Sequence, residues 1–404
     1  TLLASIGKQD IMAFCQSMPQ AFIARYPDWP LSVDGKVAGN LKRMDVERFE
    51  IALPTAFAID ADGYAENVTD MKRLLANLDV KAKTYNIDFA ALLAGMDGKS
   101  GFVIPQGIML DGNIGANGMN YEANLIARQD SGTVRLEGMF DMNSQTYQAM
   151  LGIDRLNLHN FIPNDSLYHF SAEMGIDGRG FDVFSKNTRM AACAEITQFV
   201  YGEWNLNEVK ADAKVVDGRA QINLVSHNQL ADGSLNLDAL LDKSKIDATL
   251  STDLHKADFY RLRMVEKPLT TSICAHSDVA SDLDQYHKLE GSLSDITIRA
   301  EKKTYRPTDI TIDMLTRIDT TWAKLNSGNL ALDLKASGGY KTLIEQITAL
   351  GDEISLQLEQ KVINQPKLRE LLPTVKMHLF CGNDNPFAGM LRAKGLEFDD
   401  LTLN

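Results

Sequence analysis

The sequence has few cysteines, and they lie far apart. Only Cys15, Cys193, Cys274 and Cys381 occur among the 404 residues. Zinc sites and small disulfide scaffolds need cysteines at short, paired spacings, so neither is predicted. We interpret the four cysteines as small buried hydrophobic side chains.

Long apolar runs are also missing. No stretch approaches the roughly 20 apolar residues that a membrane-spanning helix requires, and nothing resembles a signal peptide. The chain starts at Thr1 without an initiator methionine, and residues 395–404 alternate like a strand. We therefore expect a soluble, interior fragment of a longer protein.

Basic residues are outnumbered. The chain has 54 acidic and 41 basic side chains and a formal net charge of −13. A polyanion would be repelled by this charge, so no nucleic-acid partner is predicted. Anionic headgroups would be repelled as well, so any membrane contact should be apolar or mediated by another protein.

Catalytic and metal-binding motifs are absent. There is no Gly-x-Ser-x-Gly elbow and no dinucleotide or phosphate-binding glycine loop. Asp60-Ala61-Asp62-Gly63 resembles the start of a calcium loop but lacks the later ligands, and a hairpin turn explains it more simply. We predict no enzyme, no catalytic residue and no cofactor.

One group of side chains has two interpretations. A divalent metal could bind acidic and histidine side chains that are this close in sequence, but the spacing fits no known ligand loop. A polar surface loop is the favoured interpretation, so no metal site is predicted. The group consists of His276, Asp278, Asp282, Asp284 and His287.

The strongest positive signal is alternation of apolar and polar residues in short runs. This pattern places every second side chain on one face of a sheet. Two-residue turn signals separate many runs: Asp62-Gly63, Asp217-Gly218 and Asp232-Gly233 tolerate the positive φ angles of tight hairpins. We therefore predict a mainly β fold, built as a long meander of antiparallel strands.

A weak internal repeat supports a structure that grows by adding similar units. A large residue, an alanine and a leucine recur at alternate positions in three segments. They are Tyr121 to Leu125, Tyr147 to Leu151 and Ile246 to Leu250.

Helical periodicity is confined to a few segments. Short helices are predicted near residues 8–25 and 88–95, where Asp88 would cap the second. The longest helix follows Gly338-Gly339, carries Leu343, Ile347, Leu350, Ile354 and Leu358 on one face, and is followed by a shorter one to about 372. We expect the longest helix to cover part of the apolar sheet face. Residues 1–330 would form the extended groove, and 331–404 a strand, these helices and a return to the sheet.

The order of these turns and strands resembles the TamB (translocation and assembly module) family of Bacteroidetes type, within the AsmA-like group. The resemblance covers nearly the whole chain. It rests on a succession of segments and on no catalytic motif. They include residues 30–41, Leu110 to Gly115, Gly132 to Gly138, Tyr147 to Pro163, Gly175 to Gly180, Ser327 to Leu332 and Asn385-Pro386-Phe387.

The resemblance implies a curved antiparallel sheet, the β-taco, whose apolar inside forms a hydrophobic groove. It implies a periplasmic location, an inner-membrane anchor and an outer-membrane barrel partner contacted by parts outside this fragment. It also implies phospholipid transport between the two membranes, assembly of outer-membrane proteins, or both. Phospholipid acyl chains would contact the inward residues Val33, Val37, Val80, Leu110, Ile114, Leu125, Leu151, Ile222, Leu224, Leu250, Ile298, Ile312, Leu332 and Leu334.

Two alternatives remain open. The same alternation would suit a structural or protein-binding β scaffold, such as an adhesin or an assembly module, whose apolar face is sealed into a dry core. A hydrolase on a β scaffold is the third possibility, and it would need carboxylates or a nucleophile that converge in a pocket.

Overall fold

The computed structural model describes residues 1–14, 20–92, 102–163, 166–300, 303–360, 364–371, 374–392 and 401–403. The fold is mainly β, which confirms the fold class predicted from alternation. The chain divides into two compact units. Unit 1 contains residues 1–181 and 187–213, and unit 2 contains residues 182–186 and 214–404.

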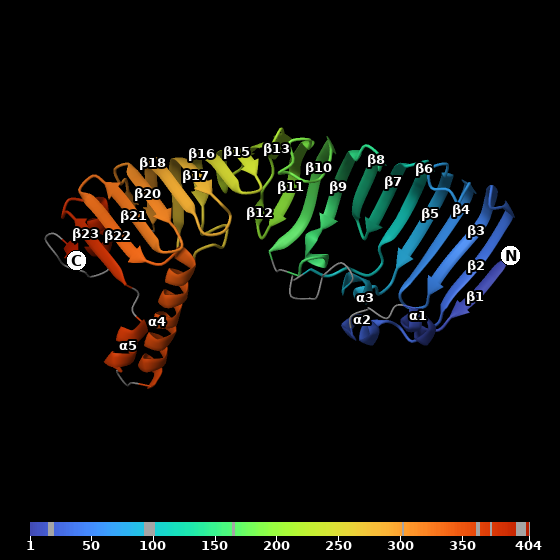
Figure 1. Ribbon diagram of the computed structural model, residues 1–404, viewed down its shortest axis with the longest axis horizontal. Coiled ribbons are helices and arrows are strands. Elements are labelled where there is room, and N and C mark those ends of the chain that lie inside the picture. The colour runs from blue at the N-terminus through green and yellow to red at the C-terminus, as the bar shows by residue number, and fades with distance from the viewer. Residues whose placement is uncertain are drawn as a thin grey trace. The chain divides into compact units, whose positions relative to one another are not determined.

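Unit 1 is an open antiparallel sheet in which each strand pairs with its neighbour in the chain (Figure 1). Its strands are β1 (Leu2–Ile6), β2 (Leu31–Asn40), β3 (Arg43–Leu53), β4 (Phe57–Glu66), β5 (Leu75–Thr84), β6 (Met109–Asn117), β7 (Asn120–Gln129), β8 (Gly132–Asp141), β9 (Thr146–Asn157), β10 (Leu167–Arg179), β11 (Arg189–Tyr201) and β12 (Trp204–Asn205). Strand β13 (Val209–Val216) crosses the boundary between the units.

Unit 2 repeats this architecture. Its strands are β14 (Arg219–His227), β15 (Ala231–Asp242), β16 (Lys245–Asp258), β17 (Leu269–Ser281), β18 (His287–Ala300), β19 (Lys303–Tyr305), β20 (Ile310–Thr316), β21 (Thr320–Ser327), β22 (Leu330–Ser337), β23 (Val375–Cys381) and β24 (Leu401–Leu403). Pairing again follows chain order, except that β18 pairs with both β19 and β20.

Helices of unit 1 gather along one long side of its sheet, where strands such as β5 and β9 end (Figure 1). They are α1 (Lys8–Phe14), α2 (Gln20–Arg25), α3 (Asp88–Ala91) and the 3₁₀ turn η2 (Leu158–Asn160). Helices therefore occur in both regions where periodicity predicts them. The predicted cap is wrong, because Asp88 is already helical and its backbone N–H bonds to Asn86 Oδ1 at 3.1 Å.

Unit 2 contains α4 (Tyr340–Gln360), α5 (Gln365–Leu371) and α6 (Pro386–Arg392). Helix α4 is anchored at its start by the buried Leu343 and by a bond from the Tyr340 N–H to Thr316 Oγ1 at 2.9 Å. Figure 1 shows α4 and α5 projecting together from the sheet. The expectation that α4 covers the apolar sheet face is wrong, since Ile347 and Ile354 on its predicted apolar face are 58% and 42% exposed.

Two of the three predicted Asp-Gly turns are not turns. Asp217-Gly218 does join β13 to β14, with positive φ at both residues. Gly63 instead lies inside β4 and Gly233 inside β15, each beside a shift in strand register. At each shift the extra residue lies on the partner strand, β3 or β16, and the glycine lies opposite this bulge. The strand therefore continues through the Asp-Gly pair with a positive φ at the glycine.

Candidate functional site: the apolar sheet faces

Strand register brings the predicted groove residues of unit 1 onto one face. Val80 lies opposite Gly112, Gly112 opposite Leu125, Leu125 opposite Leu136, and Leu136 opposite Leu151. Residues directly opposite each other in an antiparallel pair point to the same side. We call this side the apolar face of unit 1.

The other predicted residues of unit 1 lie on the same face, in two further rows across the sheet. The register gives these rows as Val33, Ile51, Ile59, Ala82 and Leu110, and as Val37, Val46, Gly63, Leu78 and Ile114. Each row crosses β2 to β6. All seven predicted positions of this unit therefore share one surface.

Unit 2 has an equivalent apolar face. One row crosses seven neighbouring pairs: Ile222, Leu237, Leu250, Ser277, Gly291, Ile312, Leu325 and Leu332. Leu224 and Leu334 lie two residues along their strands from members of this row, which places them on the same side. Ile298 lies opposite Thr271, beyond a bulge in β18. A bulge that adds one residue returns Ile298 to this face.

Exposure decides whether these faces are ordinary cores. None of the fourteen predicted residues is buried. Val37, Ile114, Ile222 and Leu224 are 38%, 42%, 38% and 37% exposed, and the others are half-buried. A sandwich would bury such residues between two sheets, but in the described part of the chain no second sheet lies over them.

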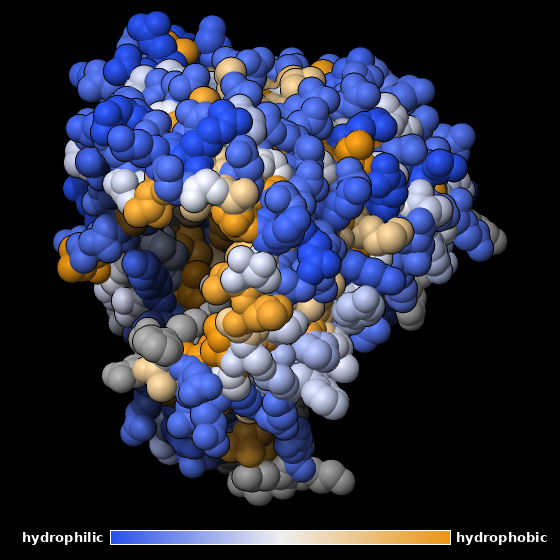
Figure 2. All heavy atoms as spheres, turned by 90° about the vertical axis from the view of Figure 1, so that its right-hand side faces the viewer, coloured by the Kyte–Doolittle hydropathy of each residue, from blue (hydrophilic) through white to orange (hydrophobic). Residues whose placement is uncertain are grey.

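Figure 2 looks at the molecule from the side of β1, and hydrophobic residues gather there around a hollow beneath a polar surface. In unit 1, the buried hydrophobic residues are instead concentrated at the edge where the helices lie. Phe22, Tyr26, Leu53, Ala56 and Phe89 form one cluster there. Burial raises the pKa of the Tyr26 hydroxyl above its ordinary value, as expected for a phenol removed from water.

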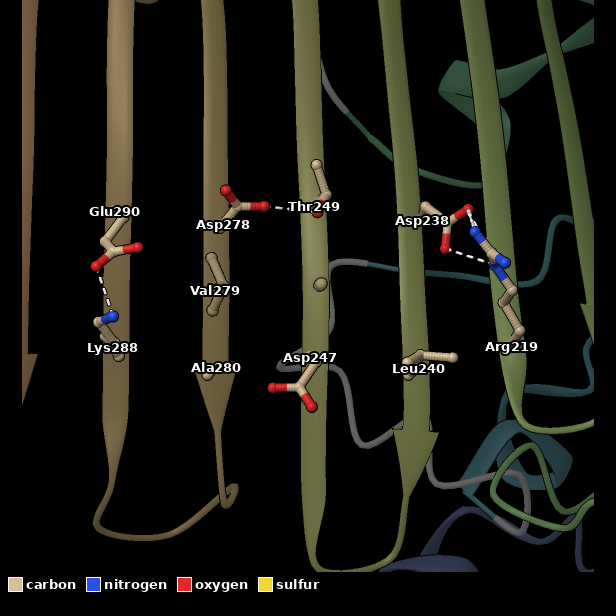
Figure 3. A pocket seen from close by; sticks show the side chains of 11 residues that line it. Arg219, Asp238, Leu240, Asp247, Thr249, Asp278, Val279, Ala280, Lys288 and Glu290 are labelled. Carbon is tan, nitrogen blue, oxygen red and sulfur yellow. Dashed lines mark hydrogen bonds and ion pairs between the residues drawn. The ribbon is translucent and has the colours of Figure 1, made fainter.

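The opposite faces carry charged and polar side chains. Figure 3 shows one shallow depression of about 330 Å³ on the polar face of β14 to β18. Arg219 binds Asp238 through two nitrogens at 2.8 and 2.6 Å, and Lys288 binds Glu290 at 2.5 Å. These carboxylates are paired within the surface, which suits a solvated sheet face.

An ionisable network on the polar face of unit 2 was not predicted from the sequence. Asp232 contacts Nδ1 of His227 at 2.9 Å and Nδ1 of His255 at 3.3 Å, and His255 Nε2 lies 3.4 Å from Asp253. The hydrogen bond with His227 is the main reason why the pKa of Asp232 is lowered. Strand register brings these residues together, and their sequence spacing alone carries no signal of it.

The predicted polar loop at 276–287 is wrong for most of its length. His276 and Asp278 lie in β17, and their side chains are 3.6 Å apart. Asp282 accepts backbone N–H bonds from residues 284, 285 and 286, and His287 Nδ1 lies 2.8 Å from Ser281 Oγ. Within the described ranges, no three His, Cys, Asp or Glu side chains are placed to share a metal ion.

The predicted burial of the cysteines is only partly confirmed. Cys381 is 2% exposed, Cys274 is half-buried and Cys193 is exposed. Cys193 belongs to the polar face of β11, opposite Gly175. Cys15 lies outside the described residues.

No family model, no curated protein and no solved structure matches this chain. Among the helices that the structure describes, none combines the length and the apolar character needed to cross a bilayer.

Proposed function

We propose that this chain is a non-catalytic part of a bacterial cell-envelope protein of the TamB and AsmA-like kind, and that its apolar faces hold phospholipid acyl chains. The observation that carries the proposal is the gathering of all fourteen predicted residues on one uncovered face in each unit. The protein would work in the periplasm, anchored in the inner membrane by a part outside this chain.

The physical basis is transfer of acyl methylenes from water to an aliphatic surface. Each buried CH₂ contributes about 0.8 kcal/mol, and a face of Val, Leu, Ile and Ala side chains offers no polar group that would hold a lipid at one position. A lipid can therefore bind and still slide from strand to strand. Transport of phospholipid between the inner and outer membranes, assembly of outer-membrane proteins, or both would use this property.

The dry β scaffold is less well supported. Sealing the apolar face would bury its side chains, whereas Ile114 at 42% and Val37 at 38% are exposed. An apolar face of this extent must be covered by something to avoid aggregation. Acyl chains provide such a cover.

Lipid content of the purified chain tests the proposal. Native mass spectrometry should detect co-purified phospholipid on the wild type. The double substitution Leu125→Asp with Leu151→Asp places two carboxylates on the apolar face, and burying an unpaired charge against an acyl chain costs more than the 1.4 kcal/mol that corresponds to a tenfold loss. We expect lipid occupancy to fall at least about tenfold.

Met150→Asp is the matched control. Met150 neighbours Leu151 on β9 but belongs to the polar face, where it is 53% exposed. This variant should keep its lipid, and circular dichroism should show that all variants remain folded. A wild-type protein without lipid, or equal lipid content in both variants, contradicts the proposed function.

A further inference from the structure

The apolar face of unit 1 has two long sides, each formed by one set of strand ends, and these two sides differ. We call such a side an edge of the face. At the first edge, Leu53 is fully buried, and Phe22, Phe89 and Tyr26 are 4%, 6% and 7% exposed. Phe89 contacts Phe22 and Tyr26 edge-on, with ring centroids 5.6 and 5.1 Å apart. Helices α1 to α3 thus close this side of the face with packed rings.

The same edge stays closed along β7 to β10. The Asn160 side chain in η2 donates a hydrogen bond to Gln129 Oε1 at 2.9 Å, and Gln129 is 6% exposed. Leu156 and Ala172 are 8% and 1% exposed. Phe161 accepts a bond from the Val103 N–H at 2.7 Å, which holds residues 102 and 103 at this side. We call it the helix edge.

The opposite edge is open and aromatic. Tyr121 lies opposite Phe140 and Phe140 opposite Tyr147, which makes one aromatic row on the apolar face. Phe181 stacks on Tyr147 with centroids 5.0 Å apart and is 61% exposed. The described helices of unit 1 all lie at the other side (Figure 1). We call it the aromatic edge.

Polar groups accompany these rings. The Tyr147 hydroxyl donates to the Gly180 carbonyl at 3.1 Å. Arg179 and Arg189 are the last register pair of β10 and β11; both are exposed and, one residue beyond Gly178, they belong to the polar face. Among the described residues neither has an ion-pair partner. They therefore add positive charge at the same strand ends as the aromatic row, on the opposite face of the sheet.

We propose that phospholipids lie across unit 1 in one orientation, with the headgroup at the aromatic edge and the acyl methyl end against the helix edge. This inference rests on the proposed function. From Gly132 to Phe140 along β8 the apolar face extends over nine residues, which are eight steps of the strand, or about 27 Å. One leaflet of a bilayer has about 15 Å of hydrocarbon, so an acyl chain fits along a strand without crossing either edge.

Two physical effects favour this orientation. Water is excluded best where side chains are fully buried. The methyl end of the acyl chain therefore has least contact with water when it faces Leu53 and Leu156. Tyrosine rings place an apolar body beside lipid chains and a polar hydroxyl beside headgroups. The reverse orientation would bring a charged headgroup against the buried phenylalanine cluster, where it would lose its hydration.

Photocrosslinking of the wild-type chain tests the orientation. Two phosphatidylethanolamine probes carry a diazirine, one at the acyl end and the other on the headgroup. Crosslinked peptides are mapped by mass spectrometry. The acyl-end probe should label peptides around Leu31, Leu53 and Leu156 at least about five times more than those around Phe140 and Phe181, and the headgroup probe should show the opposite preference.

Reversed labelling, or equal labelling of both edges by both probes, overturns the orientation and leaves the proposed function intact. Labelling confined to the polar face, or no labelling of either edge, overturns the proposed function as well. Competition with unlabelled phosphatidylethanolamine separates bound probe from random collision, because only labelling of a filled site decreases.

Discussion

Leu125 of β7 and Leu151 of β9 lie opposite the same residue, Leu136 of β8. Tyr121 and Tyr147, four residues before each leucine, likewise lie opposite Phe140. The short repeat in the sequence therefore corresponds to one hairpin of the sheet. Between β7 and β9, equivalent residues therefore return at the same height two strands apart.

Because the apolar face is open, substitution of two leucines by alanine should lower the free energy of unfolding by different amounts. Leu53 is fully buried at the helix edge, whereas Leu136 is half-buried on the apolar face. Leu53→Ala should lower the free energy of unfolding by about 2–5 kcal/mol through the cavity it leaves. Leu136→Ala should cost about 1 kcal/mol, because little packing is lost. Urea unfolding measures both, and equal losses would show that Leu136 is packed against a further layer.

Substitution of two glycines in nearby strands by alanine should change the free energy of unfolding in opposite directions. Gly63 has φ +137°, and a Cβ there would collide with the Asn77 carbonyl of β5. Gly63→Ala should destabilise the chain by about 2 kcal/mol. Gly115 lies in β6, and its Cβ would meet nothing closer than Glu122 Cβ at 3.7 Å.

Gly115→Ala is therefore the control, and it should stabilise by about 0.5 kcal/mol because it restricts the unfolded chain. Thermal denaturation followed by circular dichroism measures both changes. If Gly63→Ala proved as stable as the wild type, the bulge in β3 opposite Gly63 would not depend on glycine.

The contact between α4 and α5 should weaken in acid. A hydrogen bond from Gln357 Nε2 at 2.8 Å, and then the Lys367 ion pair at 2.6 Å, hold the pKa of Glu353 below its ordinary value. A lowered carboxyl pKa contributes stability above the ordinary value of about 4.3, and the contribution is lost as the pH falls through the lowered pKa. The protection factors of the backbone amides in α4 and α5, which correct for the intrinsic pH dependence of exchange, should fall below about pH 4.

Glu353→Gln removes the titrating group and should remove most of this acid dependence. Glu345→Gln is the control, since Glu345 is exposed on the same helix and no ion pair involves it in the described chain. Identical exchange profiles in the wild type and Glu353→Gln would show that another group controls the contact.

Asn385 should be one of the costlier polar residues to remove. It is 3% exposed, and its Nδ2 donates to the Ser327 carbonyl and to Asn329 Oδ1, both at 2.9 Å. Its Oδ1 accepts the Phe387 N–H at 3.0 Å, at the start of α6. Asn385→Ala leaves these groups unsatisfied and should cost about 1–3 kcal/mol. The exposed Asn326→Ala, as a control, should change the free energy of unfolding by less than about 0.5 kcal/mol.

Alternation predicts the two sheet faces well, because a period of two residues is a local property of any strand. Val33, Leu125, Ile222 and Leu332 are assigned to their faces by their neighbours in sequence alone. Register then only has to align faces that alternation already defines. The same reasoning does not predict whether a second layer covers a face, since coverage depends on parts of the chain far away in sequence.

The wrong predictions for Asp62-Gly63 and for α4 also come from contacts between parts of the chain that lie apart in sequence. The positive φ of Gly63 is local, but whether it makes a turn or a bulge depends on the pairing of β3 with β4. In α4 the buried residues include Glu353 and Gln357, which a hydropathy pattern places outside. They are buried because Lys367 of α5 and Asn364, the residue before α5, supply partners.

Pairing by chain order has a kinetic consequence. Within unit 1 every strand from β1 to β11 finds its partner in the strand that precedes or follows it, so few contacts need distant parts of the chain to meet. Folding of such a sheet can start at any hairpin and continue by adding one strand at a time. Evolution can lengthen or shorten it in steps of one hairpin, with only the two new interfaces to satisfy at each step.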